Sequence, residues 1–133
     1  MEVIMSLWQQ LSIEDKIIQI LQNVPEADPE HHLGRPFLTA YQIAIEYANL
    51  HPQDVTQLNL PIGGIGTGQR NSLAQYLAGE LSRRIKAGQL ARVEGGFLSN
   101  LHLNDINFDT GEKIIKSSLT GTEFTLSMFR LRD

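Results

Sequence analysis

The spacing of apolar residues changes once along this chain, near residue 90, and that change limits the fold more than any other feature of the sequence. Before it, apolar residues recur every three or four positions, as on one side of an α-helix. After it, they alternate with polar residues, as in strands with one buried face. Helices followed by strands, with no helix between the strands, predict an α+β domain with an antiparallel sheet.

The first part of the chain contains three segments with helical spacing, residues 12–23, 39–50 and 72–86. Ser12 is placed to cap the first segment and Thr39 the second. The second segment is apolar around nearly its whole circumference, which is typical of a buried helix. We therefore expect three helices, the second of them central, to pack on the sheet.

The third segment predicts a helix with one buried and one exposed face. Asn71 or Ser72 can cap it, and Gly88 is placed to end it. At about 100° per residue, the apolar residues share one face: Leu73, Ala74, Leu77, Ala78, Leu81 and Ile85. The opposite face carries polar or small residues: Gln75, Gly79, Ser82, Arg83 and Lys86. A partner can reach this second face without displacing the core.

Two stretches between the predicted helices lack helical spacing. Residues 25–36 contain three prolines and predict an exposed connection. Within residues 53–62, Leu58, Leu60 and Ile62 alternate with polar residues and proline, which indicates a short extended piece.

Turn residues divide the rest of the chain into hairpins. One hairpin is predicted over residues 90–101, with its turn at Glu94-Gly95-Gly96. A second is predicted over residues 106–116, with its turn at residues 109–112. A last strand alternates over residues 124–129. These segments predict a C-terminal antiparallel sheet of hairpins.

A hairpin behind the third of three helices resembles the plan of winged helix-turn-helix modules. The resemblance implies that the third helix enters the major groove of DNA while the hairpin contacts the backbone. Gln75, Arg83 and Lys86 on the helix and Arg92 in the hairpin are residue types that make such contacts. The connection between the second and third helices is longer than a helix-turn-helix turn, which departs from that plan.

Charge is distributed unevenly along the chain. The net charge of −4 argues against a protein that coats nucleic acid by bulk electrostatics. Residues 1–60 carry −6, residues 61–100 carry +3 and residues 101–133 carry −1. The basic middle segment can dock an anionic partner, or its charges can form an ordinary solvated helix face.

A glycine-rich loop, Gly-Gly-Ile-Gly-Thr-Gly, occupies residues 63–68 just before the third helix, where main-chain amides can hold an anion. Gln69 and Arg70 stand where a nucleotide-binding phosphate loop needs lysine and a hydroxyl. Gln69 also replaces the last glycine of the dinucleotide-binding motif. We therefore expect either a plain connector or a phosphate or carboxylate site formed by Gly64, Gly66, Gly68, Arg70 and Ser72.

The sequence predicts no cofactor, metal site or catalytic residue. His31 and His32 are adjacent in an acidic loop and point in different directions, His51 ends a helix, and His102 lies in a predicted strand. No serine lies in the motif of a nucleophilic elbow. An enzyme is therefore less expected than a binding protein.

Most aromatic residues fall at helix or strand spacing on apolar faces, so we expect them in the core: Tyr41, Tyr47, Phe97, Phe108, Phe124 and Phe129. The last strand has Leu126 and Met128 on one side and Phe129 and Leu131 on the other. A strand that is apolar on both sides needs a cover on each, which motivates a homodimer hypothesis.

The sequence as a whole predicts one domain over residues 1–133, with residues 1–10 loose. Because cysteine is absent and no apolar run reaches the length of a membrane span, we expect a cytoplasmic protein without membrane contact. Our first hypothesis is a non-enzymatic binding or regulatory module that contacts a protein or nucleic acid through segment 63–92. Arg70, Gln75, Arg83, Lys86 and Arg92 would make this contact. The alternative is a small-ligand or anion-binding domain that uses the glycine loop.

Overall fold

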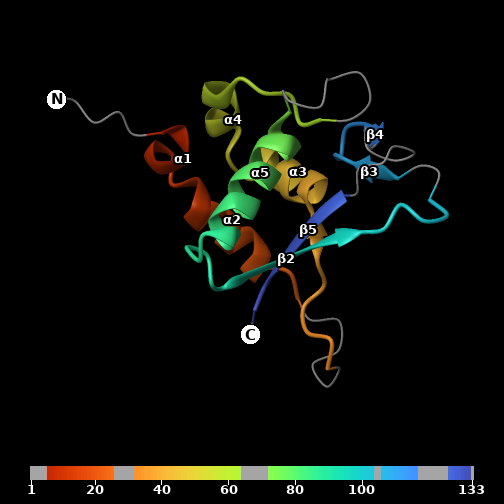
Figure 1. Cartoon of the computed structure of the whole chain (residues 1–133). Coiled ribbons are helices and arrows are strands. Elements are labelled where there is room, and N and C mark those ends of the chain that lie inside the picture. The colour runs from red at the N-terminus through yellow and green to blue at the C-terminus, as the bar shows by residue number, and fades with distance from the viewer. Residues whose placement is uncertain (1–5, 26–31, 64–71, 104–105, 117–125, 133) are drawn as a thin grey trace.

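The computed structural model of the chain describes residues 6–25, 32–63, 72–103, 106–116 and 126–132, and it shows helices together with antiparallel sheets. The helices are α1 (Leu7–Gln10), α2 (Ile13–Gln22), α3 (Ala40–Leu50), α4 (Pro52–Leu58) and α5 (Leu73–Lys86). The strands are β1 (Leu38–Thr39), β2 (Val93–Leu98), β3 (Asn107–Asp109), β4 (Ile114–Lys116) and β5 (Leu126–Leu131). The α+β class is confirmed (Figure 1).

The main sheet has the strand order β1-β5-β2 and is antiparallel throughout. The last strand is therefore central, with Gly95 of β2 opposite Phe129 of β5 and Leu38 of β1 on its other side. Strands β3 and β4 form a separate two-stranded sheet. Helices α2 and α3 contact β5, and α5 contacts β2, so helices from the first part of the chain cover strands from its end (Figure 1).

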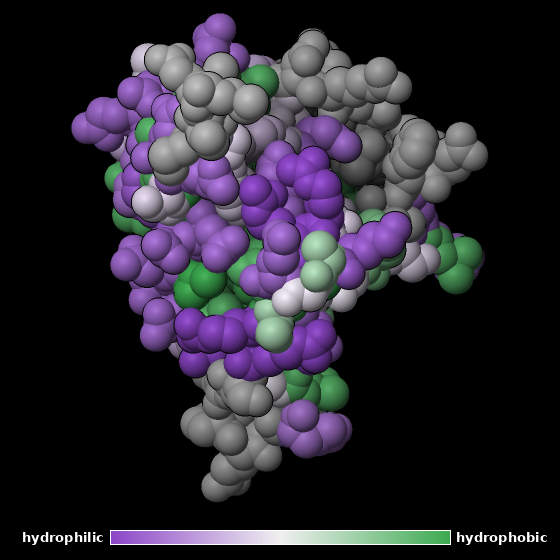
Figure 2. Space-filling model, turned by 60° about the vertical axis from the view of Figure 1, so that its left-hand side comes forward, coloured by the Kyte–Doolittle hydropathy of each residue, from purple (hydrophilic) through white to green (hydrophobic). Residues whose placement is uncertain are grey.

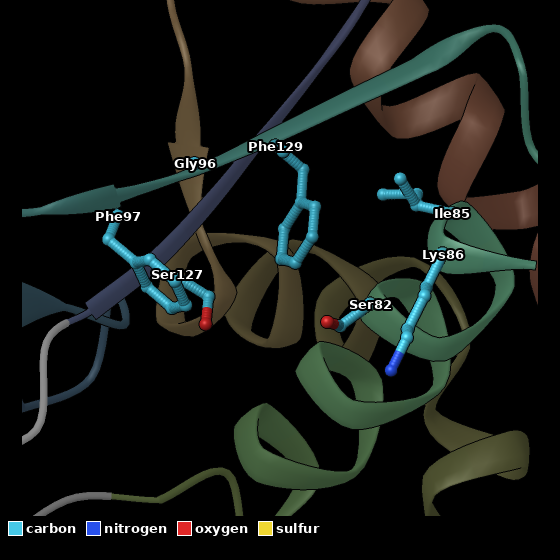
Figure 3. Close-up of a pocket in the computed structure, with 8 residues that line it drawn as sticks. Ser82, Ile85, Lys86, Gly96, Phe97, Ser127 and Phe129 are labelled. Carbon is cyan, nitrogen blue, oxygen red and sulfur yellow. The ribbon is translucent and has the colours of Figure 1, made fainter.

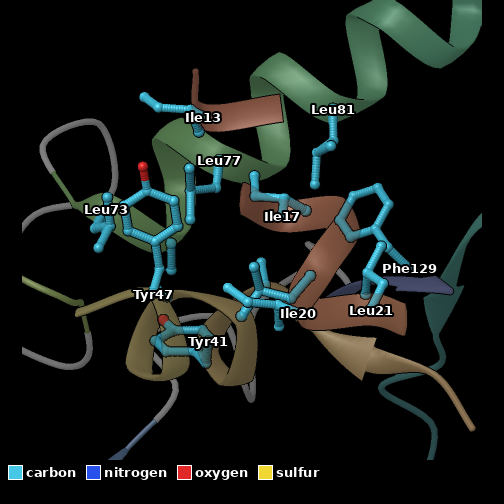
Figure 4. Close-up of a cluster of buried hydrophobic side chains, with 14 of the residues drawn as sticks. Ile13, Ile17, Ile20, Leu21, Tyr41, Tyr47, Leu73, Leu77, Leu81 and Phe129 are labelled. Atoms are coloured by element: carbon cyan, nitrogen blue, oxygen red, sulfur yellow. The ribbon is translucent and has the colours of Figure 1, made fainter. Parts of the chain in front are cut away.

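The core lies between α2, α3, α5 and β5 (Figure 4). Helix α2 contributes Ile13, Ile17, Ile20 and Leu21, α5 contributes Leu73, Leu77 and Leu81, and β5 contributes Phe129. Helix α3 buries six of its residues, among them Tyr47 with no exposed surface, which confirms it as the central helix. Removing a side chain of this size from water stabilises the fold by about 1.5–3 kcal/mol.

Local sequence signals explain several helix ends. The Thr39 hydroxyl accepts the main-chain N–H of Gln42, and the Gln42 side chain accepts the N–H of Thr39, so α3 begins with a complete capping box. Gly88 has φ +77°, and the N–H groups of Gly88 and Gln89 bond to the carbonyls of Ile85 and Arg84. This is the Schellman arrangement, which confirms that Gly88 ends the third helix.

Two helices were not predicted. Helix α1 lies directly before α2, and Ser12 between them has φ +52° with no side-chain cap bond, so its predicted capping role is wrong. Helix α4 replaces the extended piece predicted over residues 53–62. Pro52 stands at its first position, where the missing N–H costs nothing and the fixed φ favours a helix. His51-Pro52 thus ends one helix and begins the next.

The first predicted hairpin is also wrong. Glu94-Gly95-Gly96 lies inside one continuous strand, β2, which pairs with β5 rather than with residues 97–101. His102 lies in a turn with φ +60° and not in a strand. The second hairpin is confirmed as β3 and β4, and Gly111 in its turn has φ +92°. Within the described ranges, none of the helices combines the length and apolar composition that crossing a membrane requires.

Candidate functional site

The outer face of α5 is exposed as the sequence predicts. Gln75, Gly79, Ser82, Arg83 and Lys86 all face solvent, while the opposite face of the helix packs in the core. A β-carbon at Gly79 would meet nothing within 4 Å, so this mid-helix glycine faces open space. The outer face is therefore accessible along its length.

The cations of α5 differ in how far they are engaged within the chain. Arg84 pairs with the carboxylate of Glu80 and lies 4.5 Å from the ring centre of Trp8, so it holds α1 against α5. Arg83 donates to the same carboxylate at 2.6 Å, but its side chain is 68% exposed. For Lys86 no ion pair with any described residue is found. Lys86 and part of the Arg83 charge therefore remain available to a partner.

A groove of about 250 Å³ lies beside Lys86, between α5 and β2. We call it the α5–β2 groove; its lining residues are Ser82, Ile85, Lys86, Gly95, Gly96, Phe97, Ser127 and Phe129. Figure 3 shows Ser82 and Lys86 on α5 on one side of the groove and Phe97, Ser127 and Phe129 of β2 and β5 on the other. A β-carbon at Gly95 would come within 3.3 Å of the Phe129 ring, so the missing side chain helps to keep the groove open.

Phe97 forms an exposed wall of this groove. Phe97 is 70% exposed, which contradicts its predicted place in the core, whereas Tyr41, Tyr47, Phe108 and Phe129 are buried as predicted. Phe124 lies outside the described residues. On the face that Figure 2 shows, hydrophilic side chains cover most of the surface and apolar side chains form small patches between them. Leu33, Leu101 and Ile114 are exposed to a similar extent, so what distinguishes Phe97 is that its ring borders a groove.

The other predicted site residues lie in different places. Arg92 is exposed, and because its main chain pairs with Arg132, strand alternation places it on the face of Glu94, away from α5. The Ser72 hydroxyl accepts the N–H of Gln75 at 3.1 Å and so caps α5. Four residues of the glycine loop site, Gly64, Gly66, Gly68 and Arg70, lie outside the described residues.

A second hollow, of about 380 Å³, lies around Arg130, and we call it the Arg130 hollow. The Arg130 guanidinium donates to Glu94 at 2.9 Å and to the carbonyls of Leu33 and Arg35. It also lies 4.3 Å from the ring centre of Phe37. These contacts tie the segment before β1 to β2 and β5 and leave the charge of Arg130 balanced within the chain.

One polar cluster was not foreseen from the sequence. Lys16 of α2 and the hydroxyl of Tyr47 of α3 both donate to the same carboxylate oxygen of Asp54 in α4, at 2.6 and 2.7 Å. Burial alone would raise the pKa of the Asp54 carboxyl, but these hydrogen bonds and the charges of Lys16 and His51 lower it below its ordinary value. Burial and then Asp54 raise the pKa of the Tyr47 hydroxyl. The cluster joins three helices.

The described ranges hold no group of three or more histidine, cysteine, aspartate or glutamate residues that could bind a metal ion. His51 lies at the end of α3, as predicted, with its ring 5.1 Å from that of Tyr47. His32 is exposed before β1.

A comparison of the chain with protein-family models, curated proteins and solved structures found no match. The resemblance to winged helix-turn-helix modules thus has no support from a solved structure. What the protein does has to follow from the geometry of its described residues.

Proposed function

We propose that the chain is a non-enzymatic binding module that contacts a partner protein through the outer face of α5 and the adjoining α5–β2 groove. One observation carries this proposal: Lys86, without an ion pair to a described residue, borders an apolar groove that has an exposed aromatic wall. Protein interfaces combine apolar anchors of this kind with a polar rim. Segment 63–92, predicted as the contact segment, contains α5 but not Phe97.

The same surface fits nucleic acid less well than protein. Phosphate backbones are held by several cations in a row, and here Glu80 engages Arg84 fully and Arg83 in part. Arg92 is directed to the other face of β2, away from Lys86. The rings of Phe129 and Phe97 line the α5–β2 groove, and such a lining fits an apolar side chain rather than a phosphate.

The glycine loop and the homodimer stay predictions of the sequence. The Ser72 hydroxyl already accepts a hydrogen bond from Gln75, which leaves it less available to an anion. Leu126 and Phe129, from opposite faces of β5, are both buried within one chain, so that strand does not require a second subunit. A place in the cytoplasm likewise remains a prediction.

Selection of a random-peptide phage library on the purified protein tests the proposal. We expect acidic peptides with an apolar residue to be enriched, and to lose binding to the double variant Arg83→Glu/Lys86→Glu. The matched control is Lys113→Glu/Arg132→Glu, which makes the same charge change at exposed residues away from α5. Equal loss in both variants would show a bulk charge effect and overturn the proposal.

Two further measurements separate the alternatives. Fluorescence anisotropy of a labelled mixed-sequence DNA duplex should show no binding at low salt; binding that weakens steeply with salt would favour nucleic acid instead. Peptide binding that survives Arg83→Glu/Lys86→Glu but not Gly66→Val would move the contact to the glycine loop.

A further inference from the structure

One hydrogen bond at the end of the β2–β5 pair shows which residues of β2 direct their main-chain N–H and C=O groups toward β5. The Arg132 N–H donates to the Arg92 carbonyl at 2.7 Å, and the strand register places these two residues opposite each other. They therefore form a hydrogen-bonded pair, and such pairs alternate with non-bonded ones along an antiparallel ladder. The main-chain groups of Glu94, Gly96 and Leu98 consequently face β5.

The residues between them direct their main-chain groups the other way. The Val93 N–H bonds to the Leu90 carbonyl at 3.1 Å instead of to β5, which agrees with this alternation. Gly95 and Phe97 are two and four residues beyond Val93, so they too belong to non-hydrogen-bonded pairs with β5. Their N–H and C=O groups therefore point away from β5, out of the sheet edge. In the described part of the chain, β5 is the only strand beside β2. The edge therefore offers two donors and two acceptors to another strand.

The same alternation places this edge beside the α5–β2 groove. Gly95 and Phe97 lie opposite Phe129 and Ser127, and all four line the groove. A strand paired with Gly95 would direct the opposing side chain to the α5 side, where glycine leaves the space unfilled. Neighbouring side chains on that side of the added strand would lie near Lys86, which lines the groove.

We propose that an extended acidic segment of the partner protein adds to β2 as a strand, an inference that rests on the function proposed above. Its main chain pairs with Gly95 and Phe97, an apolar side chain enters the α5–β2 groove, and a carboxylate reaches Lys86. Strand addition of this kind takes affinity from main-chain bonds and specificity from pockets for alternate side chains. Lys86 in the groove lining sets the preference for an acidic segment, and Arg83, exposed on the same helix, adds to the positive charge of this face.

A second copy of the chain suits this edge less well than an acidic peptide. Two β2 strands paired about a two-fold axis would keep both α5 helices on the same side of the joined sheet. The two copies of Lys86 and Arg83 would then face each other, and like charges oppose such a pairing.

The test uses an acetylated and amidated peptide, Thr-Glu-Thr-Val-Thr-Glu-Thr, in which valine and both glutamates share one side. If valine pairs with Gly95, the amides of valine and glutamate face β2 and the threonine amides face away. N-methylation of the valine and glutamate amides should reduce affinity by at least about tenfold. N-methylation of the threonine amides is the matched control and should leave affinity unchanged.

Amide hydrogen exchange followed by NMR gives an independent readout. The N–H groups of Gly95 and Phe97 should exchange rapidly in the free protein and slow by about 100-fold at a peptide concentration about 100 times the dissociation constant. Glu94 and Gly96, already bonded to β5, serve as internal controls.

The outcomes separate the two proposals. Equal binding of both methylated peptides, or no binding of the parent peptide, overturns strand addition. Neither result overturns the proposed binding surface on α5, which the phage selection tests separately. Undiminished binding to Arg83→Glu/Lys86→Glu overturns the proposed cationic contact even if strand addition occurs. Slow exchange of Gly95 and Phe97 in the free protein, together with a dimer mass by light scattering, assigns the edge to a second copy and overturns the acidic partner.

Discussion

Strand β2 has a hollow on each of its two faces, and each hollow contains a cation. The two cations differ in whether their charge is balanced by other groups of the chain. In the Arg130 hollow, the guanidinium is engaged by Glu94, two carbonyls and an aromatic ring. In the α5–β2 groove, Lys86 forms no ion pair with a described residue, and Phe97 stands exposed. A cation in a hollow thus indicates binding only when the chain has not already balanced its charge.

The Asp54 cluster belongs with the Arg130 hollow, because its charges are also balanced within the chain, and breaking it should have the largest effect. Replacing Asp54 by Ala leaves the ammonium of Lys16 and the buried hydroxyl of Tyr47 without their acceptor. We expect a loss of about 3 kcal/mol in the free energy of unfolding, measured with urea. A loss below about 1 kcal/mol would show that water replaces the carboxylate at little cost.

The same cluster predicts how the free energy of unfolding changes as the pH falls. Because the pKa of Asp54 is lowered on folding, its contribution is complete above the unfolded pKa of about 3.9 and disappears as pH falls through the folded pKa. The difference in unfolding free energy between the wild type and Asp54→Asn should therefore shrink from about pH 7 to about pH 2. A difference that stays constant would mean that the carboxylate charge does not contribute.

Replacing Arg130 by Met should destabilise the protein by about 2 kcal/mol, because it removes several partly buried charged hydrogen bonds. Lys86→Met is the matched control in the other hollow and should change stability by less than about 0.5 kcal/mol. Comparable losses in the two variants would contradict the distinction between balanced and available cations.

Filling the groove should affect binding more than folding. In Gly95→Val the new side chain lies against the Phe129 ring and takes up space beside Ile85. We expect affinity for the acidic peptide to fall by about tenfold, measured by fluorescence anisotropy, while far-UV circular dichroism stays unchanged. Gly88→Ala is no suitable control because its φ is positive. Gly79→Ala meets open space within the chain, so it adds a side chain to the outer face of α5 without filling the groove and should weaken binding less than Gly95→Val.

The smallest expected effect is that of a single rim cation. Lys86→Met should weaken peptide binding by about threefold at low salt and by less at high salt, because exposed ion pairs contribute little and are screened. Anisotropy titrations at two salt concentrations measure this difference. A salt-independent change would point to the lost aliphatic contacts of the lysine rather than to its charge.

Structural features that depend on residues close together in the sequence could be predicted from it. The Thr39 capping box, the end of α5 at Gly88 and the exposed face of that helix depend on neighbours within one or two turns, and the structure confirms them. Pro52 is compatible both with the end of the helix over residues 39–50 and with the first position of a following helix, so the proline alone does not predict α4.

Pairings between distant segments could not be read in this way. Adjacent glycines at 95 and 96 are typical of a turn, yet they lie in a strand because β5, at the end of the chain, pairs along all of β2. The sequence likewise does not indicate that Arg84 lies over the ring of Trp8, whereas Lys86 has no cation–π contact with a described residue. The groove depends on the pairing of β2 with β5, so its lining could not be predicted from the sequence.

A titration of the isotope-labelled protein with the acidic peptide, followed by two-dimensional NMR, tests the central claim most directly, because it compares the two hollows in one experiment. Signals of Ser82, Lys86, Gly95 and Phe97 should shift, while those of Leu33 and Gly34 beside Arg130 should stay in place. Shifts concentrated at the Arg130 hollow, with none at the α5–β2 groove, would contradict the account.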